Sequence, residues 1–362
     1  MPTIHALLGL LASAHACTTV VVNSTDGATV IGRTMELGPP VPKKLADELW
    51  RIVTLPRGAA VGPETSRYGA VMISAAANRT SFAAEGMNEA GLTVSVQTLH
   101  QASYETAEAR GAPAMAYSDV AAYLLGACQT VGDVDAALRR VTVVDAPAFA
   151  GIFGRCHWIV ADAAGGNVVV EYLAGAPRTI HDNARVGVAT NDPDYEWHLR
   201  NLNNYAAYPT ARDEPGWGLD AVQTAVGAVP SVPGHGLNTR GLPAGTTPPD
   251  RFVKMFLLRE TAAANAPPAT VDDAIVLATG LLNTVHLVQG TVARISSLDG
   301  LEWTNWAVIK IPAERRFLVR TYSDLGWRNV DVKAVDFTQT HEPLVLYDAL
   351  GPVRDFTPGR AE

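Results

Sequence analysis

Cysteine is scarce in this chain of 362 residues, which contains only Cys17, Cys128 and Cys156. A small, odd number of cysteines over such a length argues against a disulfide-stabilised scaffold. The sequence has no CxxC pair, and its nine histidines form no HExxH motif, so no metal site is expected. The GxSxG elbow and the GxxxxGK phosphate loop are also absent, which removes two common enzyme classes. We therefore expect any chemistry to proceed without a metal or cofactor.

Long apolar runs and blocks of like charge are missing too. No stretch of about 18 or more apolar residues occurs, so no membrane-spanning helix is indicated. The formal net charge of −8 is spread along the chain and leaves no basic face for phosphate groups. A nucleic-acid partner is therefore not expected. Hydrophobic residues make up 48% of the chain, enough for the core of two domains or of one large layered domain.

The first sixteen residues have features of a leader that is removed. Ala6 to Ala12 form a short apolar stretch, and Ala14-His15-Ala16 is the small-residue pattern that signal peptidase accepts just before Cys17. We therefore predict that residues 1–16 are a cleaved signal peptide and that the protein is exported, to the periplasm or the outside of the cell. Because Met1 to His5 contain no Lys or Arg, a plain propeptide or a misassigned start stays open. A cysteine directly after the cut also allows a lipoprotein, in which the amine of this cysteine is blocked.

A cysteine that becomes N-terminal by cleavage carries its own base. Its α-amino group, with a pKa of about 8, can accept the thiol proton directly or through a water molecule. The thiolate can then attack an amide carbonyl, and water later releases the acyl-enzyme. A lone cysteine is more often a buried structural residue. The position of Cys17 after a predicted cleavage site is therefore the observation that favours catalysis.

Strand and helix signals occur in blocks along the chain. Runs rich in β-branched and apolar residues predict strands, which we place at 17–22, 28–33, 71–74, 92–98, 158–162, 167–172, 306–311, 316–321 and 329–332. Helical periodicity predicts helices at 118–127, 131–138, 252–262 and 271–282. Strand pairs, then helices, then strand pairs indicate an α+β protein with antiparallel sheets covered by helices.

Six blocks, in order along the chain, resemble a known family. Cys17-Thr18-Thr19 is followed by Gly32-Arg33-Thr34-Met35-Glu36, and later blocks lie at 86–92, 156–162, 190–203, 241–252 and 282–291. These blocks resemble the choloylglycine hydrolase family, which contains bile salt hydrolases and penicillin V acylases. The resemblance implies the four-layer αββα sandwich of N-terminal-nucleophile hydrolases, as a single domain over 17–362 that is exposed by processing. It also implies hydrolysis of a linear amide in a small N-acyl substrate, such as a conjugated bile salt, penicillin V or an N-acyl homoserine lactone.

The resemblance also implies roles for individual residues. Cys17 would be the nucleophile, and Arg33, 16 residues later, would support the thiolate because a nearby cation lowers a cysteine pKa. Glu36 would hold the α-amino group. Asn191 would donate its side-chain amide to the oxyanion, and Arg251 would complete the charged cluster. The structural alternatives are a surface ion pair for Arg33 and Glu36, a turn-capping amide for Asn191, and a solvated arginine at a helix start for Arg251.

Thr98, assigned to substrate binding, departs from the family pattern. Bile salt hydrolases usually carry Asn at this position and penicillin acylases often carry an aromatic residue, whereas threonine offers a hydroxyl but no amide. Glu36 stands where the family has Asp and therefore reaches one methylene farther. We expect that Thr98 weakens any preference for bile salts.

A second hypothesis treats the chain as an exported, non-catalytic binding protein, or a lipid-anchored surface protein, that keeps the fold without turnover. The joint presence of Cys17, Arg33, Asn191 and Arg251 argues against it. A homo-oligomer, tetramer or dimer, stays open.

Overall fold

Two antiparallel sheets form the centre of the molecule. The computed structural model describes residues 16–37, 49–75, 82–109, 111–147, 154–175, 178–213, 221–224, 227–230, 236–293 and 301–346. The six-stranded sheet has the order β14 (Val188–Ala189), β1 (Cys17–Asn23), β2 (Thr29–Glu36), β19 (Thr304–Ile311), β20 (Arg316–Thr321), β21 (Asp324–Asp331). The eight-stranded sheet has the order β13 (Thr179–Asp182), β12 (Asn167–Glu171), β11 (Cys156–Ala161), β8 (Thr93–Thr98), β7 (Ala83–Asn88), β6 (Ala70–Ala75), β3 (Trp50–Leu55), β22 (Leu344–Val345).

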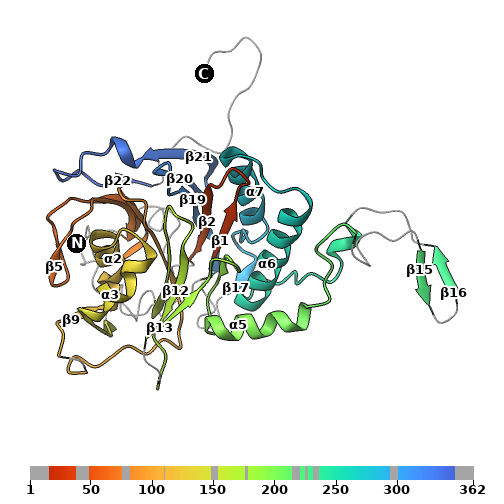
Figure 1. Ribbon diagram of the computed structural model, residues 1–362, viewed down its shortest axis with the longest axis horizontal. Coiled ribbons are helices and arrows are strands. Elements are labelled where there is room, and N and C mark those ends of the chain that lie inside the picture. The colour runs from red at the N-terminus through yellow and green to blue at the C-terminus, as the bar shows by residue number, and fades with distance from the viewer. Residues whose placement is uncertain are drawn as a thin grey trace, which may run out of the picture.

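Helices cover the outer face of each sheet. Helices α2 (Val120–Ala127) and α3 (Val134–Arg139) lie on the eight-stranded side, and α6 (Pro248–Asn265) and α7 (Val271–Asn283) lie on the six-stranded side (Figure 1). Helix α5 (Tyr195–Asn201) follows β14 and leads toward α6. The predicted αββα sandwich is therefore confirmed.

Smaller elements occur between the main strands and helices along the chain. Short strand pairs are β4 (Ala60–Val61) with β5 (Glu64–Thr65), β9 (Ala114–Ala116) with β10 (Thr142–Val144), β15 (Ala221–Thr224) with β16 (Gly227–Pro230), and β17 (Val292–Ala293) with β18 (Leu301–Glu302). Single turns of 3-10 helix are η3 (Tyr117–Asp119), η4 (Val131–Asp133), η5 (Leu202–Tyr205), η6 (Leu237–Thr239) and η7 (Val332–Ala334).

Strand β1 is buried on both faces because it lies between the second sheet and the outer helices. Its sequence CTTVVVN is rich in β-branched residues, and only Asn23 at its end is exposed. Helix α7 begins with a capping box formed by Thr270 and Asp273 and packs on β1 and β2. At Gly32 on β2, an added Cβ would lie only 3.1 Å from a methyl carbon of Leu282, so glycine allows this close approach.

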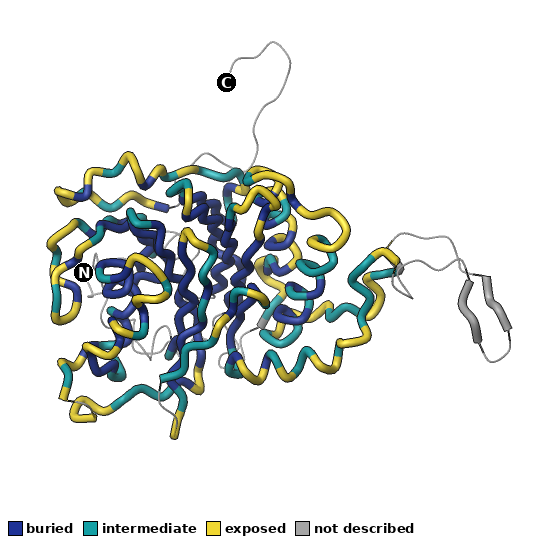
Figure 2. Tube along the Cα trace, in the orientation of Figure 1, coloured by how far each residue is buried: buried dark blue, intermediate teal, exposed yellow. Residues whose placement is uncertain are grey.

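The core has one apolar layer beneath each pair of helices and one between the sheets (Figure 2). In the middle layer, Trp50 of β3 and Trp306 of β19 meet edge to face, with ring centroids 5.4 Å apart. This layer also buries charges, since Glu85 of β7 pairs with Lys310 of β19 across the two sheets. Buried charges of this kind persist where they have partners, and these two lie directly behind the site described next.

The sequence predicted nine of the fourteen strands in the two main sheets and four of the helices. The long strands of the six-stranded sheet and the helices at α2, α3, α6 and α7 are confirmed within a few residues at each end. The strands that were not predicted are β3, β7, β13, β14, β22 and those of the short pairs, and helix α5 was not predicted either. The predicted leader, residues 1–16, lies outside the described residues except for Ala16.

Candidate active site

Cys17 is the first residue of β1, and it is buried. Ala16 still precedes it in this structure. Its backbone nitrogen donates to Asn191 Oδ1 at 2.7 Å. Its Sγ lies 3.2 Å from Arg33 Nη2 and 3.6 Å from Met35 Sδ. The register of β1 with β2, which places Cys17 opposite Met35, brings the thiol to the strand that carries Arg33.

Arg33 is buried in β2 and is held from three directions. Its Nη2 also donates to the carbonyl oxygen of Val96 at 2.7 Å, and its guanidinium lies 4.7 Å from the ring centroid of Trp306. Its Nη1 lies 3.7 Å from Glu85 Oε2. The surface ion pair that we considered for Arg33 is therefore wrong, because the side chain is fully buried beside the thiol.

The thiol is neutral in this environment. Burial raises the pKa of Cys17 above its ordinary value of 9.0, and the charges of Arg33 and Arg251 only partly offset that effect. The charge of Arg33 lowers the pKa of Cys17, but the loss of solvent around the buried thiol raises it by more. A nucleophilic role for this sulfur therefore requires a base close to Sγ.

Asn191 and Arg251 close the other side of Cys17. Asn191 Oδ1 accepts from Arg251 Nη2 at 2.8 Å as well as from the Cys17 nitrogen, and Asn191 Nδ2 donates to the Thr98 carbonyl at 3.0 Å. Arg251, in the first turn of α6, donates through Nη1 to Thr18 Oγ1 at 2.6 Å and to the Cys17 carbonyl. Burial lowers the pKa of Arg251, which the charge of Glu36 opposes. The Asn191 side chain thus forms hydrogen bonds to β1, β8 and α6, and its role is more than that of a turn cap.

Glu36 lies at the end of β2, next to Ala16, the residue before Cys17. Its backbone nitrogen donates to the Ala16 carbonyl at 2.9 Å, and its Oε1 accepts from Thr304 Oγ1 at 2.8 Å. Its Oε2 has no partner among the described residues. Burial raises the pKa of Glu36 to about 7. In the chain that carries Ala16, the Cys17 nitrogen donates to Asn191 Oδ1 rather than to this carboxylate.

The structure brings together all six residues singled out in the sequence. Thr98 ends β8, where it pairs with Cys156 in the ladder and presents its carbonyl to Asn191. Sequence reasoning missed Glu85 and Lys310, which lie behind Arg33, with Lys310 Nζ also 2.9 Å from Ser95 Oγ. A single charged residue inside each of the apolar segments AAEGM and AVIKI was the signal that could have found them.

Two further properties of the described residues bear on function. No three His, Cys, Asp or Glu side chains in this part of the chain gather closely enough to hold a metal ion. None of the helices that the structure describes is both long enough and apolar enough to cross a bilayer.

Comparison with known proteins gives consistent matches over most of the chain. A model of linear amide C–N hydrolases of the choloylglycine hydrolase family matches residues 17–346. A bile salt hydrolase/transferase from Clostridium perfringens is 25% identical over 294 residues, which are 79% of this chain and 83% of that protein. A solved variant of conjugated bile acid hydrolase from Clostridium perfringens has a TM-score of 0.80 at 21% identity, covering 94% of this chain and all 100% of that one. Penicillin V acylase from Agrobacterium tumefaciens has a TM-score of 0.67 at 20% identity, covering 89% and 88%. These two solved structures have the same fold as this chain.

Proposed function

Since the chain belongs to the choloylglycine hydrolase family of linear amide C–N hydrolases, we propose that it cleaves its amide substrate with Cys17 as an N-terminal nucleophile. The observation that carries the proposal is the pair of contacts at this residue. Its nitrogen lies 2.7 Å from Asn191 Oδ1, and its sulfur lies 3.2 Å from Arg33 Nη2. The family match begins at the same residue, which agrees with a mature chain that starts there.

Removal of residues 1–16 supplies the base that the neutral thiol requires. The new α-amino group accepts the Sγ proton, and the sulfur forms a bond to the carbonyl carbon of the substrate amide. When the tetrahedral intermediate collapses, the C–N bond breaks and the α-ammonium group of Cys17 returns its proton to the leaving amine. Water then attacks the thioester with the same amine as base, which releases the acid and restores the thiol.

The residues around Cys17 have separate roles in this mechanism. Asn191 Nδ2 carries two hydrogens, of which the Thr98 carbonyl accepts one, so the second is available to the oxyanion. Arg251 fixes Asn191 through its Oδ1 atom, and Arg33 stabilises the thiolate. Glu36, with an unpartnered buried Oε2, takes up the charge of the α-ammonium group that forms during the reaction.

The proposed substrates are N-acyl amides of the kinds named for its relatives, conjugated bile acids and penicillin V, together with N-acyl homoserine lactones. Thr98 lacks the amide that bile salt hydrolases usually place here. We therefore propose that a simpler N-acyl amide is a better substrate than a conjugated bile salt.

An amine-release screen with a defined N-terminus tests this proposal. Protein expressed with its natural leader is purified, its intact mass and N-terminal sequence are determined, and it is assayed on glycine- and taurine-conjugated bile salts, penicillin V and acyl homoserine lactones. We expect a free Cys17 at the N-terminus and release of amine from at least one substrate. An active species that begins at any other residue contradicts the mechanism. An added diacylglyceryl mass supports a lipid-anchored protein instead. Recovery of the mature chain outside the cytoplasm tests the proposed export.

A further inference from the structure

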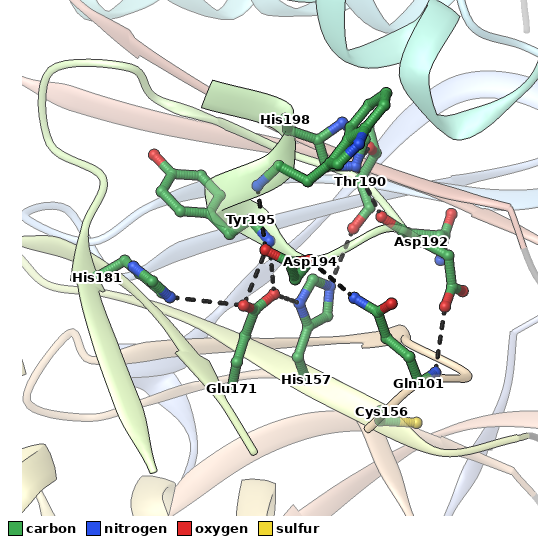
Figure 3. Close-up of polar contacts among 12 residues, drawn as sticks. Gln101, Cys156, His157, Glu171, His181, Thr190, Asp192, Asp194, Tyr195 and His198 are labelled. Atoms are coloured by element: carbon green, nitrogen blue, oxygen red, sulfur yellow. Dashed lines mark hydrogen bonds and ion pairs between the residues drawn. The ribbon is translucent and has the colours of Figure 1, made fainter. Parts of the chain in front are cut away.

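The loop that carries Asn191 is held at both ends by one buried charged pair outside the residues discussed so far. His157 on β11 places Nε2 2.9 Å from the Thr190 carbonyl, directly before Asn191. Glu171 on β12 accepts from the backbone nitrogen of Tyr195, at the start of α5, at 3.0 and 3.2 Å. The two side chains join through His157 Nδ1 and Glu171 Oε1 at 2.9 Å (Figure 3).

The contacts define the charge on this pair. Burial raises the pKa of Glu171, but hydrogen bonds from His157, His181 and the Tyr195 nitrogen outweigh it and hold the pKa at about 2. An ionised carboxylate only accepts hydrogen bonds, and so does the Thr190 carbonyl. Both nitrogens of His157 therefore face acceptors, and both contacts are satisfied only when the ring is an imidazolium.

A second histidine fixes Asn191 itself. His198, in α5, places Nε2 2.9 Å from the Asn191 carbonyl and stacks on Phe252, with ring centroids 4.6 Å apart. Burial lowers the pKa of His198 to about 4, so the ring is neutral and donates from Nε2. The backbone around Asn191 is thus held by contacts at residues 190, 191 and 195, while its side chain contacts Cys17, Thr98 and Arg251.

We propose that His157 and Glu171 are positioning residues for the hydrolysis: as an imidazolium–carboxylate pair they fix the loop from Thr190 to Tyr195 and so place the Asn191 amide beside Cys17. The proposal rests on the function proposed for Asn191 above. A catalytic donor must lie within a narrow range of positions to stabilise an oxyanion, and a misplacement of about 1 Å can cost two orders of magnitude in rate. Neither side chain needs to contact the substrate for this role.

Glu171→Gln tests the pair with little change in volume. The glutamine oxygen can still accept from the Tyr195 nitrogen, but the charge that stabilises the imidazolium is lost. On the processed enzyme, well below its melting temperature, we expect kcat to fall about tenfold, KM to change less than about twofold, and Glu171→Asp to recover part of the rate. Asp135→Asn on α3 removes a partly exposed carboxylate that pairs with Arg178, away from the residues around Cys17, and serves as a charge-removal control with unchanged kcat. A wild-type kcat in Glu171→Gln overturns the proposal.

Combination with Asn191→Ala separates this proposal from the one on which it rests. If the pair acts through Asn191, Glu171→Gln lowers kcat in the wild-type background and has no further effect in the Asn191→Ala background. Independent, additive losses overturn the positioning role. A wild-type kcat in Asn191→Ala alone instead refutes the function proposed for Asn191.

A measurement on the unaltered protein gives the protonation state of this histidine directly. Nitrogen NMR of ¹⁵N-histidine-labelled enzyme should show one imidazolium protonated on both nitrogens at the pH of the assay, assigned to His157 by its absence in His157→Gln. A ring with a single proton at this position overturns the proposal.

Discussion

Asn191→Ala is the substitution that most directly separates catalysis from stability at this site. The asparagine amide makes three hydrogen bonds, to the Cys17 nitrogen, to Arg251 Nη2 and to the Thr98 carbonyl. Truncation leaves these buried groups without that partner, which we expect to lower the free energy of unfolding by about 3 kcal/mol. Loss of an oxyanion donor should lower kcat about a hundredfold or more, equivalent to about 2.7 kcal/mol of transition-state stabilisation.

Asn88 provides a matched control. Its side chain is also buried and makes three hydrogen bonds, donating to the Leu125 and Cys128 carbonyls and accepting from the Leu92 nitrogen. None of these contacts involves the residues around Cys17. Asn88→Ala should therefore destabilise the protein by a similar amount without lowering kcat.

Both variants are compared with the wild-type enzyme by urea unfolding and by kcat and KM on the best substrate of the screen, at a temperature where all three are folded. We expect similar losses of stability and a kcat loss in Asn191→Ala alone. Equal kcat values for the two variants would refute the reasoning, because the role of Asn191 would then be structural.

Three other expectations follow from the same contacts. Processed Cys17→Ser should retain only a small fraction of wild-type kcat, because a hydroxyl is far less acidic than a thiol, and a rate close to wild type would place the nucleophile elsewhere. In an inactive Cys17→Ala chain that keeps its leader, burial raises the Glu36 pKa from 4.5 to about 7, so the folded state holds a proton that the unfolded state releases. The free energy of unfolding of this chain should then fall as the pH rises from 4.5 to about 7, by up to about 3 kcal/mol. Urea titrations should show no such fall when Glu36→Gln is added. Thr98→Ala should cost much less in kcat/KM than Asn191→Ala, with conjugated bile salts the poorer substrates, and equal losses would disprove this view of Thr98.

The sequence was most informative where local pattern decides structure. The β-branched run of β1 and the capping residues of α7 are strong local signals, and both elements are confirmed. Strand β7, with the sequence AAEGMN, contains a charge and a glycine that weaken any strand pattern. Helix α5 has the sequence YEWHLRN, in which few apolar residues mark a buried face. Tertiary contacts, not local preference, stabilise these two elements.

The candidate site was predictable to the extent that motif residues define it. Family motifs identified Cys17, Arg33, Asn191 and Arg251, which the fold brings into contact from β1, β2, the loop after β14, and α6. The buried partners of these residues were not predictable, because an ion pair such as Glu85 with Lys310 joins positions 225 residues apart across two sheets. The weakened acidity of the Cys17 thiol was also hidden, since it depends on how deeply the sulfur is buried.

The place of Cys17 in the β1 ladder has a practical consequence for making this enzyme. The residue is aligned by pairing with Met35 on one neighbouring strand, and β1 continues along β14 at Thr19 and Val20. These pairings should keep Cys17 in place after cleavage, when only its bond to Thr18 ties it to the chain. Under the proposed mechanism, an affinity tag fused ahead of Cys17 should give a well-folded protein without activity. A gene that starts directly before Cys17 should give activity only to the extent that the host removes the initiator methionine.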